Sequence, residues 1–190
     1  MQKYKVTVAD KALEEIRGKP LIQISNADGE LYLGFGEMIQ WDKHKAPQYV
    51  LKIATQFRFT LDTEIILGKQ DLFWPSYEES HKKGFKMDEF NPNSKKQSRF
   101  NEQIERFFNA DVIGDYIVKD VRAGKMGDFL LIFKNGARLE VVSDAFDLPT
   151  IDDNYELWRL FETNKNKSDF VVKPLGIAET DEEWGFESHE

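Results

Sequence analysis

The sequence has 190 residues and none of them is cysteine. Disulfide bridges, thiol nucleophiles and sulfur-ligated metal sites are therefore excluded. Histidine is scarce as well, because only His44, His81 and His189 occur, and none has the spacing of a metal-binding motif such as His-Glu-X-X-His. We expect these three side chains at the surface, and we expect neither a metal site nor a cofactor.

Motifs that bind phosphate or activate a serine are also missing. Gly34-Phe-Gly36 lacks the third glycine and the following helix of a dinucleotide-binding loop, and no Gly-X-Ser-X-Gly occurs. Neighbouring carboxylates such as Asp152 and Asp153 point to opposite faces of a strand, and on a loop they face water. We assign no catalytic residue, and the sequence favours a protein that is not an enzyme, although active sites need not be contiguous in sequence.

The sequence has no long apolar run, and it has fewer basic than acidic residues. No segment approaches the roughly 18 apolar residues of a membrane span, and Met1 to Asp10 lacks the apolar centre of a signal peptide. The 34 acidic and 26 basic residues give a net charge of −8, which disfavours binding to a phosphate backbone. The sequence predicts a cytoplasmic protein that binds neither nucleic acid nor membrane; its acidity favours basic partners or serves only solubility.

The composition is that of a folded, aromatic-rich domain. Hydrophobic residues make up 41% of the chain and charged residues 32%, with 15 Phe. A chain of this length buries most of its apolar surface in one core. We predict a single α+β domain over residues 1–178, followed by an acidic flexible tail over residues 179–190.

Hydrophobic periodicity and turn residues divide the domain into elements. Helices are predicted from Asp10, as a cap, to Gly18, and over 98–109, where an apolar stripe suits a core position. A longer connection is expected over 36–48, and the least regular stretch over 74–97. Asn135-Gly136 predicts a hairpin with a type I′ turn. Strands are predicted over 21–24, 31–35, 49–53, 56–59, 64–67, 116–121, 129–133, 138–142, 156–161 and 169–172.

The order of these elements repeats over residues 10–72 and 98–178. Phe57-Arg58-Phe59 matches Trp158-Arg159-Leu160, and Leu51 and Ile53 match Leu139 and Val141. We therefore predict a mostly antiparallel fold from two pseudo-repeated halves that share one core. Each half is expected to form an incomplete sheet, with its apolar face covered by the other half about a pseudo-twofold axis.

Three runs in the second half carry a resemblance: Asn-Gly-X-Arg-Leu-Glu-Val from Asn135, Glu-Leu-Trp-Arg-Leu-Phe from Glu156 and Asp-Phe-Val-Val from Asp169. Together with Leu67-Gly-Lys-Gln-Asp-Leu72 in the first half, they resemble an uncharacterised bacterial family of cytoplasmic proteins. The resemblance covers nearly the whole chain except the acidic tail. It implies no activity, but some relatives resemble immunity-type accessory proteins near toxins, which implies a protein partner.

Arg58 and Arg159 are the candidate ligand-binding residues, because each lies between apolar residues of a predicted strand. Two related guanidinium groups would bind one acidic ligand between the halves. Alternatively, each arginine points outward from a half-buried strand, where Glu140 on a neighbouring strand would pair with it.

Trp41, Trp74 and Trp184 are the candidate interaction residues, since exposed aromatic side chains on loops or tails mark interfaces. Packing of the loops onto the sheet is the alternative. We interpret the chain as a non-catalytic interaction protein or a homo-oligomer, which uses sheet edges or residues 74–97 as its contact surface. The second hypothesis is an enzyme or small-ligand-binding protein with a polar site between the halves.

Overall fold

The computed structural model describes residues 8–92, 97–143, 156–163, 169–173 and 186–187. Its helices are α1 (Val8–Leu13), α2 (Tyr77–Ser80) and α3 (Arg99–Phe107), with 3-10 turns η1 (Glu14–Ile16), η2 (Lys69–Leu72), η3 (Met87–Glu89) and η4 (Ile113–Asp115). The strands are β1 (Leu21–Ala27), β2 (Glu30–Trp41), β3 (His44–Ile53), β4 (Gln56–Leu61), β5 (Glu64–Gly68), β6 (Val118–Ala123), β7 (Phe129–Phe133), β8 (Arg138–Val142), β9 (Trp158–Glu162), β10 (Asp169–Val172) and β11 (Phe186–Glu187).

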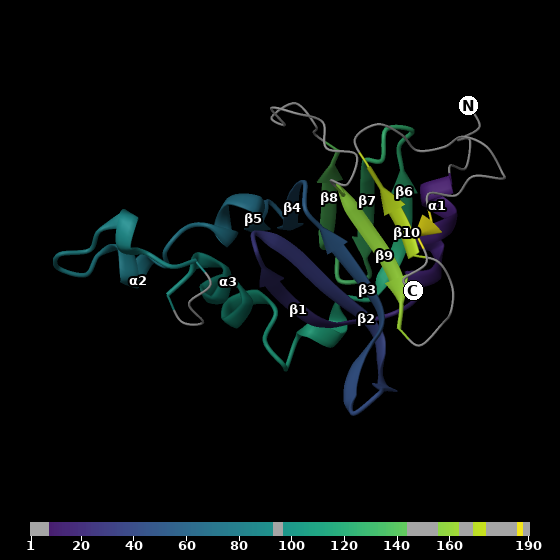
Figure 1. The fold of residues 1–190 in the computed structure, drawn as a ribbon, viewed down its shortest axis with the longest axis horizontal. Coiled ribbons are helices and arrows are strands. Elements are labelled where there is room, and N and C mark those ends of the chain that lie inside the picture. The colour runs from purple at the N-terminus through teal and green to yellow at the C-terminus, as the bar shows by residue number, and fades with distance from the viewer. Residues whose placement is uncertain (1–7, 93–96, 144–155, 164–168, 174–185, 188–190) are drawn as a thin grey trace.

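These strands form two antiparallel sheets within the described ranges. Sheet 1 has the order β1-β2-β3-β9-β10-β11, and sheet 2 has the order β5-β4-β8-β7-β6. Figure 1 shows sheet 1 lying in front of sheet 2. The prediction of a mostly antiparallel α+β fold is confirmed.

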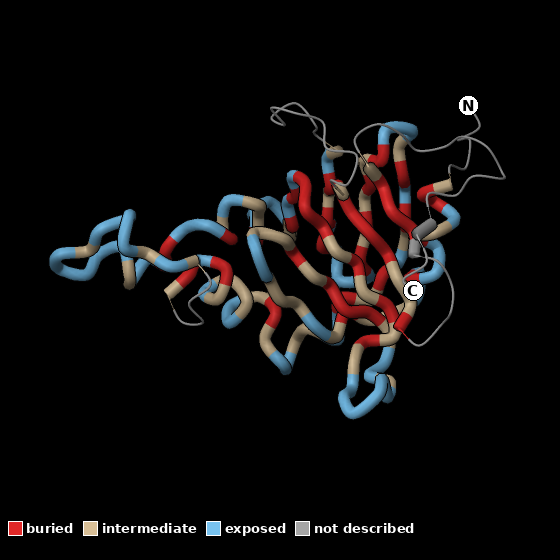
Figure 2. Tube along the Cα trace, viewed as in Figure 1, coloured by how far each residue is buried: buried red, intermediate tan, exposed pale blue. Residues whose placement is uncertain are grey.

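The core lies between the two sheets, because apolar residues at alternate positions of each strand face the same interior. Leu31, Leu33 and Phe35 of β2 are fully buried, and alternating residues of β7 are buried in the same cluster. Figure 2 shows that the buried residues gather along the strands of the two sheets. Trp158 of sheet 1 packs edge-on against Phe129 of sheet 2, with ring centroids 5.0 Å apart. Its indole N–H donates to the carbonyl of Gly127 over 2.7 Å, so the largest buried side chain also ties the sheets together.

The sheets are not built one from each half of the chain, contrary to our expectation. β4 leaves the first half and pairs with β8, while β9 leaves the second half and pairs with β3. Each sheet therefore contains strands from both halves. The exchanged strands contribute to the same core, since β4 buries Phe57 and Phe59 there and β9 buries Trp158 and Leu160.

The two sheets nevertheless correspond in order and register. Reading β1-β2-β3-β9-β10 against β6-β7-β8-β4-β5 places the pair Ile53 and Trp158 where the pair Val141 and Phe57 lies in the other sheet. The starts of β1 and β6 also exchange reciprocal hydrogen bonds, from Leu21 N to Tyr116 O at 2.9 Å and from Val118 N to Lys19 O at 3.0 Å. Descent of the halves from one duplicated unit stays a prediction.

The predicted connection over 36–48 is wrong. β2 and β3 continue through it as one long hairpin, in which Trp41 pairs with His44 around a two-residue turn. Gly36 has a φ of 89°, and the pairing shifts between Phe35 and Met38, so a bulge accommodates the glycine that the sequence pattern treats as a strand end. Pro47 sits beside this irregularity, opposite Met38.

The Asn135-Gly136 hairpin forms between β7 and β8, but its predicted type I′ turn is wrong. Gly136 has a positive φ of 91°, whereas Asn135 does not, and Gly136 N donates to Phe133 O at 3.1 Å. This is the pattern of a three-residue loop ending in a glycine. The turn between β1 and β2 has the type I′ character instead, with φ values of 51° at Asp28 and 76° at Gly29.

The helix over 98–109 is confirmed with slightly shorter bounds, and Ser98 caps it by accepting the N–H of Asn101. Phe100 and Phe108 enter the core as expected. Gly18 takes the predicted positive φ, at 78°. The irregular stretch over 74–97 contains α2 and η3, and the described part of the tail is β11, whose two residues pair with β10.

Trp158→Phe is expected to lower the free energy of unfolding by about 1–3 kcal/mol, because the buried carbonyl of Gly127 loses its donor and the core loses volume. Trp41→Phe removes the same atoms at an exposed hairpin tip and should change the free energy of unfolding by no more than about 0.5 kcal/mol. Urea denaturation of both variants provides the comparison. Equal losses would contradict the role given to Trp158.

Candidate functional site

Arg58 points away from the core on the outer face of sheet 2, between the buried Phe57 and Phe59. Its Nε donates to Glu140 of β8 over 2.7 Å, directly across the strand pair. The structure therefore brings Arg58 and Glu140 together as an exposed cross-strand ion pair. Such a pair contributes little to stability and presents no enclosed ligand site.

Arg159 lies on the outer side of sheet 1, because its neighbours Trp158 and Leu160 face the core. It is only 8% exposed, and its guanidinium pairs with Glu156. Glu156 in turn lies 3.5 Å from Lys52, which also pairs with Glu30. The two candidate arginines thus lie on the outer faces of different sheets, so the described residues do not bring them together between the halves.

The candidate tryptophans have different positions. Trp41 is 57% exposed at the tip of the β2–β3 hairpin, and Trp74 is 53% exposed after η2. Trp184 lies outside the described residues.

The described histidines do not form a site. His189 lies outside the described residues, whereas His44 and His81 are exposed, and His81 stacks on Tyr77 with ring centroids 4.0 Å apart. Among the described residues, no three His, Asp or Glu side chains come together as a metal site.

The structure draws attention to two sheet margins that occupy corresponding places in the fold. β6 is one of the two edge strands of sheet 2, with β5 at the other end, and β1 is one of the two edge strands of sheet 1, with β11 at the other end. α1 packs against β6, and η4 packs against β1. Residues of α3 line a hollow beside β1. An edge strand directs half of its backbone N–H and C=O groups away from its sheet, so each margin needs other partners for those groups.

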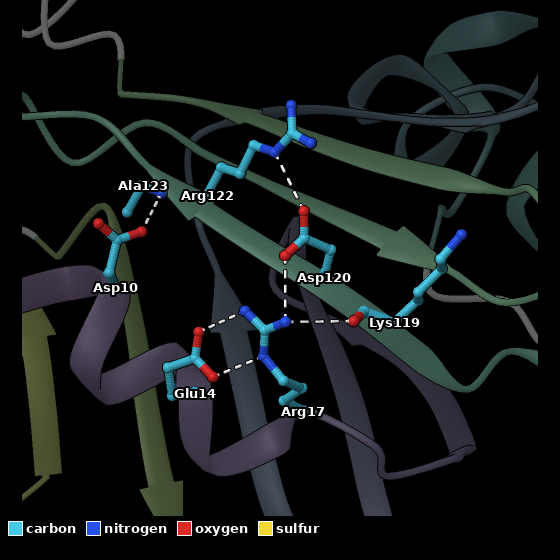
Figure 3. Close-up of polar contacts among 7 residues, drawn as sticks. All are labelled: Asp10, Glu14, Arg17, Lys119, Asp120, Arg122 and Ala123. Carbon is cyan, nitrogen blue, oxygen red and sulfur yellow. Dashed lines mark hydrogen bonds and ion pairs between the residues drawn. The ribbon is translucent and has the colours of Figure 1, made fainter. Parts of the chain in front are cut away.

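The β6 margin is closed by the chain itself (Figure 3). Asp10, which is 5% exposed, accepts the N–H of Ala123. Arg17 donates to the carbonyl of Lys119 and pairs with Asp120 over 3.1 Å. Asp10 is thus a helix residue that caps a strand edge, and the predicted role of capping its own helix is wrong.

Asp120 completes this closure. Burial opposes its ionisation, but hydrogen bonds from Arg122 and from the Val121 N–H, together with the charges of Arg122 and Arg17, outweigh burial and lower the pKa of Asp120. Asp10, Arg17 and Asp120 thus bind backbone or charged groups along the described part of the β6 margin.

The corresponding groups of β1 have no such partners. Ala27 and Glu30 flank the two-residue turn and form a hydrogen-bonded pair, so the next residues alternate between bonds to β2 and bonds to the outside. By this alternation the N–H and C=O groups of Ile24 and Asn26 point away from β2. No hydrogen bond from them to any described residue is found.

A hollow of about 410 Å³ lies beside this edge. Its lining comes from β1, from α3 and from Pro92: Ile24, Ser25, Asn26, Ala27, Asp28, Pro92, Phe100, Asn101 and Ile104. Apolar side chains form much of it, and Asp28 is the titratable side chain among these lining residues. We call this feature the β1–α3 groove.

An arm formed by residues 73–92 borders the groove and projects beyond α3 (Figure 1). Its base is fixed to α3, because Ser76 N donates to Gln97 O at 2.7 Å and Arg99 N donates to Trp74 O at 2.8 Å. The arm carries the exposed side chains of Phe73, Trp74, Tyr77 and Met87. Pro92, in the lining of the groove, joins the two features into one surface.

Lys69 holds the arm against the β1–β2 turn. Its ammonium donates to Gly29 O at 2.7 Å and to Ala54 O at 2.6 Å, and it lies 5.8 Å from the ring centre of Phe73. Burial lowers the pKa of Lys69. A Cβ on Gly29 would lie 2.7 Å from the Phe73 ring, so only glycine allows this close approach. The aromatic base of the arm is therefore positioned at the turn end of the groove.

Comparison with protein-family models, with curated proteins and with solved structures found no match to this chain. Of the helices that the structure describes, none has the length and apolar character needed to span a bilayer. The assignment of a site therefore depends on the geometry of the chain itself.

Asp10→Ala is expected to lower the free energy of unfolding by about 1–3 kcal/mol, since it removes the buried carboxylate that accepts the Ala123 N–H. Asp10→Asn keeps an acceptor oxygen and should lose clearly less. Thermal unfolding of the two variants under one buffer condition measures the difference. If Asn proved as damaging as Ala, the hydrogen bond would not be what Asp10 contributes.

Two proline substitutions test which β1 groups point outward. Asn26→Pro removes an N–H that β2 does not use, and edge strands tolerate proline at such positions. Ser25→Pro removes an N–H bonded to Tyr32 and should cost at least about 1 kcal/mol more in the free energy of unfolding. Denaturant titrations of both variants decide between them, and the opposite ranking would invalidate the assigned register.

Proposed function

We propose that this chain is a non-catalytic protein-interaction protein that binds its partner at the β1–α3 groove and the adjoining arm. The observation that carries the proposal is the β1 edge, where Ile24 and Asn26 present backbone groups without a described partner beside a partly apolar hollow. An extended segment of another protein satisfies such groups by adding a strand to the sheet.

The contrast with β6 supports this proposal. Exposed strand edges promote aggregation, and proteins normally cover them. The chain covers the β6 edge with α1, Asp10 and Arg17. A similar helix beside β1 leaves a hollow of about 410 Å³ instead. The difference favours an edge kept accessible for a partner.

The side chains around the groove also suit a protein partner. Phe73, Trp74 and Tyr77 are exposed next to it, and aromatic residues supply much of the binding energy in protein interfaces. The sequence resembles an uncharacterised bacterial family in which some relatives resemble immunity-type accessory proteins, and this resemblance also implies a protein partner. Catalysis has less support, because Asp28 has no second acid or base among the described lining residues.

Partner capture with matched variants tests the proposal. The full chain is immobilised as wild type, as Asn26→Pro, as Ile104→Glu and as Met126→Glu, whose site is 76% exposed in the β6–β7 loop. A protein that uses the groove should be retained by wild type and Met126→Glu and weakened at least about tenfold by the other two variants. Unfolding curves confirm that each variant is folded.

Hydrogen exchange then tests whether the captured partner binds at the β1 edge. In the purified complex, the amides of Ile24 and Asn26 should exchange more slowly than in the free chain, because strand addition gives them acceptors. The proposal fails if no specific partner is retained, if the groove variants bind it as tightly as wild type, or if these two amides are not protected.

A further inference from the structure

Resting on the proposed function, we infer that the segment bound in the β1–α3 groove is an extended strand that carries aliphatic side chains at alternate positions and basic residues beside them. Three features of the groove define this chemistry: the spacing of its free backbone groups, the apolar lining of the hollow, and the charge at its turn end.

The backbone spacing selects an extended segment. Ile24 and Asn26 lie two residues apart on one edge, so their N–H and C=O groups recur with the period of a β-strand. A helix uses its own backbone groups internally and offers none to an edge. A strand laid along β1 instead donates to and accepts from both residues.

The β6 margin shows which group occupies the position in sheet 2 that corresponds to Asn26 in sheet 1. Asn26 pairs with Leu31, which pairs with Ile53; Ala123 pairs with Phe129, which pairs with Val141. The Ala123 N–H has a carboxylate oxygen of Asp10 as its acceptor. An oxygen acceptor therefore fits this place in the fold, and a main-chain carbonyl of a bound strand supplies one to Asn26.

The charge of the groove disfavours a second carboxylate. Asp28 lines the hollow and has no ion pair with any described residue, whereas the Lys69 ammonium at the same turn is bound to the carbonyls of Gly29 and Ala54. The chain as a whole carries a net charge of −8. An acidic ligand would be repelled, whereas a Lys or Arg side chain next to the bound strand would pair with Asp28. Basic residues are therefore expected where the segment passes the β1–β2 turn.

The apolar lining of the groove determines which other side chains we expect in the bound segment. Ile24 shares the inner face of sheet 1 with Leu33, so a residue added opposite Ile24 points toward the same face, where Phe100 and Ile104 line the hollow. The volume of about 410 Å³ exceeds what one side chain needs. Residues opposite Ile24 and opposite Asn26, two positions apart, both enter it.

Selection from a displayed library of random twelve-residue peptides tests the inference on the full chain. Binders are selected on wild type after removal of those that also bind Ile104→Glu, and the survivors are measured against Asn26→Pro. The expected survivors alternate Val, Ile or Leu at positions i and i+2, carry Lys or Arg nearby, and lose affinity at least about tenfold with Asn26→Pro.

A matched pair of aspartates isolates the charge. Asp28 and Asp62 both occupy hairpin turns with φ near 50°, at 51° and 52° respectively. Asp28→Asn should weaken the selected basic peptides about two- to five-fold, and added salt should reduce that difference. Asp62→Asn, in the β4–β5 turn, should leave binding unchanged.

The outcomes separate the inference from the proposed function. Survivors that depend on the groove but are acidic, proline-rich or insensitive to Asp28→Asn would overturn the partner chemistry while a binding groove remains. Survivors that bind Asn26→Pro as tightly as wild type, or no survivors at all, would count against both.

Discussion

The need of every edge-strand backbone group for a hydrogen-bond partner governs this structure. Two sheets enclose the core, and each described margin leaves N–H and C=O groups that point outward. A buried group without a partner costs free energy comparable to a lost hydrogen bond, so each margin must be covered or remain in contact with solvent or a ligand. The chain covers the β6 margin with its own residues and leaves the β1 margin accessible.

The exchange of strands between the halves explains why both margins exist. Because β4 joins sheet 2 and β9 joins sheet 1, each sheet ends on the first strand of a half, β1 or β6. The helix before each half then lies near that margin of the other sheet: α1 packs against β6, and α3 lines the groove beside β1. Equivalent topology thus produces two margins whose side chains differ, and the side chains decide which one is closed.

Most strands could be predicted from β-type runs between turn residues. In β2 the alternation of Leu31, Leu33 and Phe35 also indicates the buried face, whereas β7 is apolar throughout, so its buried face is known only from the structure. The long β2–β3 hairpin could not, since a bulge at Gly36 accommodates a residue that normally ends a strand. The groove was also beyond sequence reasoning. Ile24 becomes an edge residue only through the order of strands in sheet 1, and a short apolar run carries no information about which strand is outermost.

Arg58 and Arg159 also show that the sequence does not predict the order of strands in a sheet. Their outward direction followed from the apolar neighbours Phe57 and Phe59 or Trp158 and Leu160, but their convergence required both to lie in one cleft. Strand exchange puts them on the outer faces of different sheets, with Glu140 and Glu156 as partners. The β1 edge differs at Ile24 and Asn26, whose outward backbone groups have no partner among the described residues. A strand added there would extend sheet 1 and bind only the folded chain, so occupancy of the groove and stability of the domain are thermodynamically coupled.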